Sequence, residues 1–138
     1  MTKLHRGTWI VAACHEGALI LENAGAAQEP DLRLIDRLEA PAAHPLPTGQ
    51  AHPEVTDRAS LALSAFAARV VGRLAREVAR GNARHLVLAA APPLLTAIRD
   101  RMDDDLRARL MLTLPQTLTR HPVPRIAAEV QTALSRAA

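Results

Sequence analysis

Side chains that could hold a metal ion are scattered along the sequence. Asp103, Asp104 and Asp105 are adjacent in a helical pattern, where successive side chains diverge by about 100°, so they do not form one cage and pairing with nearby arginines is expected. A zinc site made by Cys14, His44 and His52 is the alternative, although His44 and His52 lack the spacing typical of metal ligands. We therefore predict neither a metal nor another cofactor.

The possible nucleophiles are equally isolated. Cys14 lies in a strand pattern, where its neighbour His15 points to the opposite face, so the two do not form a nucleophile and base pair. Cys14 is expected to be a buried thiol. The sequence has no Gly-x-Ser-x-Gly elbow and no glycine-rich phosphate loop. No catalytic residue is predicted from these patterns.

Four arginines repeat at helical spacing and are the candidates for nucleic-acid binding. They are Arg69, Arg73, Arg76 and Arg80. The spacing lines one helix face, which suits contact with phosphates, and a solvated helix surface is the alternative interpretation. The net charge is only +3, and Trp9 and Phe66 are the only aromatic residues, so base stacking is disfavoured.

The elements that position these residues begin with three strands. Residues 8–14 and 18–22 are β-rich and apolar around a turn, which predicts a hairpin, and residues 32–38 follow as a third strand with Leu32, Leu34 and Leu38 on one side. Residues 40–57 contain four prolines and Gly49 and are predicted to form a long surface loop.

The second half of the sequence alternates helices and strands. A helix is predicted from Thr56 or Asp57 to the stop at Gly81-Asn82, followed by a strand over 85–91 buried on both faces. Another helix begins at Pro92, presents Leu94, Leu95, Ile98, Met102 and Leu106 as its buried side, and carries the three aspartates at its end.

A strand over 109–114 and a helix over 122–136 complete the chain. The order β-β-β-α-β-α-β-α predicts an α/β fold, with a mixed sheet and helices on its faces, of ribonuclease-H-like topology. The 138 residues suit a single domain. The sequence lacks an apolar stretch of membrane-spanning length and a secretory pattern, so we expect a cytoplasmic protein with no membrane contact.

Three segments resemble the bacterial host attachment protein family, named for proteins required for attachment to host cells. They are the opening hairpin over 9–23, the strand and helix start over 86–99 with Ala91-Pro92-Pro93, and Leu118-Thr-Arg-His-Pro122. Leu94 and Thr117 depart from this pattern, standing where the family usually has Arg and Asp. That family is similar to the central domain of archaeal and eukaryotic class-1 release factors, which implies the same ribonuclease-H-like fold.

The release-factor resemblance also implies a role for the proline-rich loop. In release factors the corresponding loop carries Gly-Gly-Gln, and here it contains Thr48-Gly49-Gln50 with Thr48 in place of the first glycine. By this resemblance, Gly49 would permit a backbone turn and the Gln50 amide would position a hydrolytic water.

These observations support three hypotheses. The first is a non-enzymatic cytoplasmic module that binds RNA, a ribosomal component or a protein and affects attachment indirectly. The second is a ribosome-associated peptidyl-tRNA hydrolase or rescue factor that uses Gly49 and Gln50. The third is a homodimer formed through apolar faces of the terminal helix and an edge strand.

Overall fold

The fold is a five-stranded mixed sheet with helices on both faces, as predicted. The computed structural model describes residues 3–40 and 53–137. The sheet order is β3-β2-β1-β4-β5: the first three strands form an antiparallel meander, and β4 and β5 run parallel to β1. The strands are β1 (Trp9–Cys14), β2 (Gly17–Asn23), β3 (Leu32–Glu39), β4 (Leu86–Ala89) and β5 (Leu110–Leu114). This order is consistent with the ribonuclease-H-like prediction.

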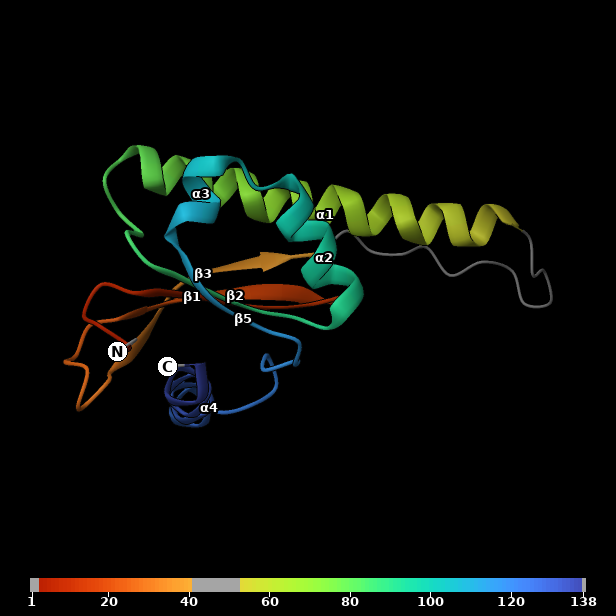
Figure 1. Cartoon of the computed structure of the whole chain (residues 1–138). Coiled ribbons are helices and arrows are strands. Elements are labelled where there is room, and N and C mark those ends of the chain that lie inside the picture. The colour runs from red at the N-terminus through yellow and green to blue at the C-terminus, as the bar shows by residue number, and fades with distance from the viewer. Residues whose placement is uncertain (1–2, 41–52, 138) are drawn as a thin grey trace.

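Helices α1, α2 and α3 lie on one face of the sheet and α4 lies on the other (Figure 1). They are α1 (Pro53–Ala79), α2 (Pro92–Arg101), α3 (Asp104–Arg109) and α4 (Val123–Ala137). The amino-terminal part of α1 extends past the sheet, and the helix packs against the core from Leu63 onward. Within the described residues, no helix has both the length and the apolar character needed to cross a bilayer.

Alternate residues of the central strands build two separate cores. Ile10 and Val87 face α4, whereas Val11 and Leu88 face α1 and α2. Because side chains alternate across a sheet, a strand covered on both faces must be apolar at every position. β4 meets this requirement, since all four of its residues are buried, as its continuous apolar run predicted.

The third strand carries an irregularity that the sequence pattern did not predict. Ile20 pairs with Asp36 and the next residue, Leu21, pairs with Leu34, so Ile35 is an extra residue in β3. Leu32 therefore packs in the α4 core and Leu38 against the α1 core, while Leu34 is 48% exposed. The prediction that Leu32, Leu34 and Leu38 share one side is wrong for this reason.

The first helix begins earlier than predicted. We expected a loop over 40–57 and a helix from Thr56 or Asp57, but α1 begins at Pro53. Proline is well suited to a first helical turn, because its fixed φ angle is helical and the N–H it lacks would be unpaired there. Residues 53–57 therefore belong to the helix.

The helix predicted to begin at Pro92 is interrupted before the aspartates. α2 ends at Arg101, and Met102 takes an extended conformation. Asp103 then caps a new short helix, with its Oδ1 accepting a hydrogen bond from the Leu106 N–H at 2.9 Å. Leu106 is therefore buried by α3 and not by a continuation of α2.

Candidate functional site

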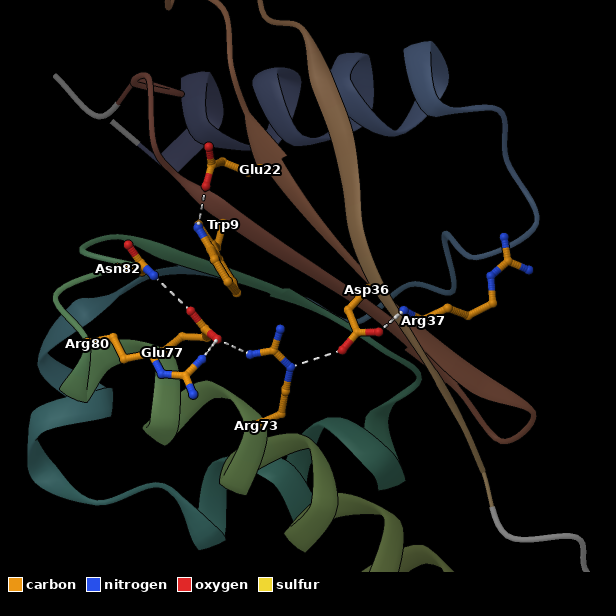
Figure 2. Close-up of polar contacts among 8 residues, drawn as sticks. All are labelled: Trp9, Glu22, Asp36, Arg37, Arg73, Glu77, Arg80 and Asn82. Atoms are coloured by element: carbon orange, nitrogen blue, oxygen red, sulfur yellow. Dashed lines mark hydrogen bonds and ion pairs between the residues drawn. The ribbon is translucent and has the colours of Figure 1, made fainter.

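A buried carboxylate organises the sheet-facing side of α1. Glu77, whose side chain is only 8% exposed, accepts hydrogen bonds from Arg73 Nη1, from Arg80 Nη1 at 3.2 Å and from Asn82 Nδ2 at 2.8 Å. Figure 2 shows the three donors converging on this one carboxylate. A buried charge is tolerated only when it is paired and hydrogen-bonded, and Glu77 meets both conditions.

Arg73 connects this cluster to the sheet. Its Nε donates to Asp36 Oδ2 on β3 at 3.0 Å, and the arginine side chain is 19% exposed (Figure 2). The extra residue at Ile35 brings Asp36 to the α1 side of the strand, the same side as Leu38. We call Asp36, Arg73, Glu77, Arg80 and Asn82 the α1 polar cluster.

The hydrogen bonds of the cluster hold both carboxylates in the charged form. The Asn82 amide and then the Arg73 guanidinium lower the pKa of Glu77, against a smaller opposing effect of burial. The Arg73 guanidinium and the Arg37 backbone N–H lower the pKa of Asp36. The pKa of Arg73 is raised, chiefly by its bond to Asp36. A carboxylate with a lowered pKa is a poor general base near neutral pH, so the cluster is suited to holding structure.

The four predicted arginines differ in what they contact. Arg73 is committed to Asp36 and Glu77, and Arg69 donates to the backbone oxygen of Glu39 at 2.7 Å. Arg80 is 70% exposed although it also reaches Glu77. Arg76 is exposed and, within the described residues, makes no side-chain hydrogen bond or ion pair. Arg69, Arg76 and Arg80 therefore keep exposed side chains along α1, while Arg73 is held between the helix and the sheet.

A groove of about 610 Å³ lies at the carboxyl ends of β1 and β4. In a parallel arrangement this end of the sheet is where ligands commonly bind. Its apolar lining comes mainly from Leu63 on α1 and from Ala91, Pro93 and Leu94 at the start of α2. The remaining lining residues are Cys14, His15, Thr117, Arg120 and His121.

The groove is lined mainly by three segments that are distant in sequence. They are close to the three segments that carry the family resemblance. The β1–β2 turn, the start of α2 and the β5–α4 connection each supply a wall. Leu94 and Thr117, the two positions that depart from the host attachment pattern, both line it. The departures therefore replace an expected charged pair with an apolar and a hydroxyl side chain at one place.

A second cavity of about 310 Å³ adjoins the same end of the sheet and shares Cys14 and Arg120 with the groove. Arg120 bonds Glu16 at 3.3 Å, and the Ala40 N–H donates to the Glu16 carbonyl at 3.2 Å. Ala40 is the last described residue before α1. Thr48, Gly49 and Gln50 lie outside the described residues, so the predicted hydrolytic role of Gly49 and Gln50 stays a prediction.

The other candidate residues are placed as follows. Cys14 is half-buried, not fully buried as expected, and its Sγ accepts from the Glu16 N–H at 3.4 Å. Asp105 pairs with Arg109 at 3.5 Å, as predicted for the acidic run. Within residues 3–40 and 53–137, no group of three His, Cys, Asp or Glu residues is placed so that it could hold a metal ion. His44 and His52 lie outside the described residues.

The sequence patterns did not single out Asp36, Glu77 or Asn82. Glu77 follows Arg73 by four residues, a spacing that brings side chains together on a helix, and this was the available signal. Asn82 was interpreted only as a helix stop, whereas its side chain also bonds Glu77. The extra residue in β3 decides which side of the strand Asp36 lies on, and the sequence pattern did not predict it.

Comparison with known proteins identifies the family. The family model for bacterial archaeo-eukaryotic release factor family 12 matches residues 7–130. The chain therefore belongs to this family, which confirms the predicted likeness to release factors. No curated protein matches the sequence.

Proposed function

We propose that this member of the bacterial release factor family 12 acts in translation as a non-enzymatic RNA-binding module that contacts the ribosome through the exposed arginines of α1. Its membership of a release-factor family over residues 7–130 supports a translation-related role. The observation that carries the binding mode is the set of exposed guanidinium groups of Arg69, Arg76 and Arg80 along one helix.

The exposed arginines of α1 are better suited to binding the phosphate backbone of RNA than to binding its bases. Arginine presents several N–H donors in a planar fork that matches phosphate oxygens. Trp9 and Phe66 are both buried in the α1 core, so neither offers its ring to a base. Contacts of this kind position a protein on RNA without reading its sequence. The expected binding is therefore sensitive to salt and tolerant of sequence.

Fluorescence anisotropy with a labelled ribosomal RNA fragment tests this proposal. Each phosphate contact contributes roughly 0.7–0.9 to the slope of log affinity against log salt concentration. The Arg69→Gln/Arg76→Gln variant should reduce both the affinity and the slope. Arg101→Gln/Arg136→Gln removes the same net charge from α2 and α4 and serves as the matched control. If both variants bind as tightly as the wild type with the same slope, the α1 surface is not the RNA contact.

The second candidate function is peptidyl-tRNA hydrolysis by Gly49 and Gln50. It is favoured by the resemblance to release factors, whose loop between the third strand and the first helix carries Gly-Gly-Gln. Gly49 and Gln50 stand in the sequence between the end of β3 at Glu39 and the start of α1 at Pro53. Hydrolysis of peptidyl-tRNA that is abolished by Gln50→Ala, with RNA binding retained, would establish it. Binding that survives Gln50→Ala, with no hydrolysis by the wild type, favours the non-enzymatic module.

The proposal includes a cytoplasmic location and an effect on host attachment that is indirect, through translation. A protein partner or a homodimer is the alternative. The apolar residues Ile126, Val130 and Leu134 of α4 pack in the core, which leaves Leu34 and Ile35 on β3 as the exposed apolar residues of the expected dimer surface. Light scattering at micromolar concentration tests for the dimer.

A further inference from the structure

Two loops at the amino ends of β1 and β4 place four basic residues around one cavity. His5 and Arg6 precede β1, and Arg84 and His85 precede β4. All four side chains are exposed, and all four line a cavity of about 310 Å³ whose wall also contains Glu22. This cavity lies at the opposite end of these strands from the groove described above.

The first loop is held by a buried asparagine. Asn23 Nδ2 donates to the carbonyl oxygens of Leu4 at 2.8 Å and His5 at 3.3 Å. Its Oδ1 accepts from the N–H groups of Gly25 and Asp31. The Asn23 side chain is therefore fully used in fixing the backbone that carries His5 and Arg6.

The second loop is held by the α1 polar cluster. The Asn82 side chain bonds the Glu77 carboxylate at 2.8 Å (Figure 2). The Asn82 backbone N–H donates to the Glu77 carbonyl at 2.9 Å. Ala83 then takes a positive φ of 53° with its methyl group buried, a conformation that a non-glycine residue adopts at a cost of about 1 kcal/mol or more. The His85 carbonyl accepts from the Trp9 N–H at 2.9 Å, which ties this loop to β1.

The lining of the cavity carries the two guanidinium groups of Arg6 and Arg84 and the single carboxylate of Glu22. Within the described residues, neither Arg6 nor Arg84 takes part in an ion pair. Glu22 is the acidic residue of the lining, and its Oε2 accepts from Trp9 Nε1 at 2.9 Å (Figure 2). The imidazole rings of His5 and His85 lie 6.3 Å apart between their centroids. Two guanidinium groups and two imidazoles thus surround a space that is open to an anion.

We propose that this cavity is a phosphoryl-binding site formed by Arg6, Arg84, His5 and His85. Guanidinium groups match phosphate oxygens in charge and geometry, and imidazole adds N–H donors. The volume is at the lower end of the range for small-ligand pockets, which suits a phosphoryl group. The group could belong to free phosphate, to a mononucleotide or to RNA, and the site does not depend on RNA binding by α1.

NMR titration of the intact protein tests the site directly. The probes are inorganic phosphate, AMP and a short RNA with or without a 5′-phosphate, and the readout is the imidazole resonances of His5 and His85. We expect a saturable shift of both resonances with at least one probe. In Arg6→Gln/Arg84→Gln the apparent affinity should fall by roughly tenfold or more. Arg101→Gln/Arg136→Gln, which has the same net charge, should respond like the wild type.

The probes also distinguish the source of the phosphoryl group. Saturation by inorganic phosphate or AMP alone indicates a small ligand, whereas saturation by RNA alone indicates a backbone or terminal phosphate. Shifts that do not saturate with any probe overturn the proposal. So does a saturable response of equal affinity in Arg6→Gln/Arg84→Gln, provided that circular dichroism shows this variant to be folded.

Discussion

Arg73 on α1 and Asp36 on β3 bond at 3.0 Å between Nε and Oδ2, and this contact joins the longest helix to an edge strand. The same guanidinium bonds Glu77, so one side chain fixes the helix both to the strand and to its own next turn. The consequence for function is that Arg73 is not available to RNA. It instead holds the helix that presents Arg69, Arg76 and Arg80 to solvent.

Replacing Glu77 tests the contribution of the α1 polar cluster to stability. Glu77→Gln should lower the free energy of unfolding by about 1–3 kcal/mol, because the side-chain donors of Arg73 and Asn82 lose a buried charged acceptor. Chemical denaturation followed by circular dichroism measures the loss. Glu129→Gln removes a partly exposed carboxylate that also pairs with an arginine four residues away, and should cost less than about 0.5 kcal/mol. Equal effects of the two changes would show that the cluster is not structural.

The cluster also predicts how stability depends on pH. The pKa values of Asp36 and Glu77 are lowered in the folded protein, so the folded state binds these protons less readily than the unfolded chain. Their stabilisation is therefore present above the unfolded pKa values, near 4, and is lost as the pH falls from about 5 toward the folded pKa values. Urea midpoints measured between pH 7 and pH 3 should fall less in Asp36→Asn/Glu77→Gln than in the wild type. Parallel pH profiles would contradict the assignment.

The break between α2 and α3 depends on a single cap. Asp103→Ala should cost about 1 kcal/mol, because the Leu106 N–H loses its acceptor at the start of α3. Asp104→Ala, one residue later in the first turn, keeps the cap and should cost less. Thermal unfolding of the two variants measures the difference. A larger loss in Asp104→Ala than in Asp103→Ala would contradict the capping role.

The groove makes a prediction about Leu94 and Thr117. Leu94 is buried, so Leu94→Arg should destabilise the fold by placing a guanidinium in an apolar wall. Adding Thr117→Asp supplies a carboxylate that lines the same groove, and the pair should recover about 0.5–3 kcal/mol of coupling energy. A double-mutant cycle of unfolding free energies measures this value. If the changes in unfolding free energy caused by the two substitutions simply add, the side chains at positions 94 and 117 do not interact across the groove.

The architecture was predictable because its signals are local. The apolar run of β4, the 3–4 spacing of α1, the helix stop at Gly81 and the helix start at Pro92 each specify an element without reference to distant residues. Where prediction failed, a polar side chain or an extra residue decided the structure. Asp103 converted one helix into two, and Ile35 shifted the register of β3.

The functional surfaces were predicted less well, because they depend on which distant residues meet. Arg69, Arg76 and Arg80 have exposed side chains, whereas Arg73 is set apart by its contacts with Asp36 and Glu77, which the spacing alone did not predict. The groove and the amino-end cavity each combine segments from several elements. Their basic residues occur singly or in pairs in the sequence, so no motif marks them.

The most direct test of the translation role is co-sedimentation of the purified protein with ribosomes at increasing salt concentration. We predict that the wild type and a Gly49→Ala/Gln50→Ala variant co-sediment equally, and that Arg69→Gln/Arg76→Gln dissociates at lower salt. Failure of the wild type to sediment with ribosomes at any salt concentration, or binding that is lost in the Gly49 and Gln50 variant but kept in the arginine variant, would contradict it.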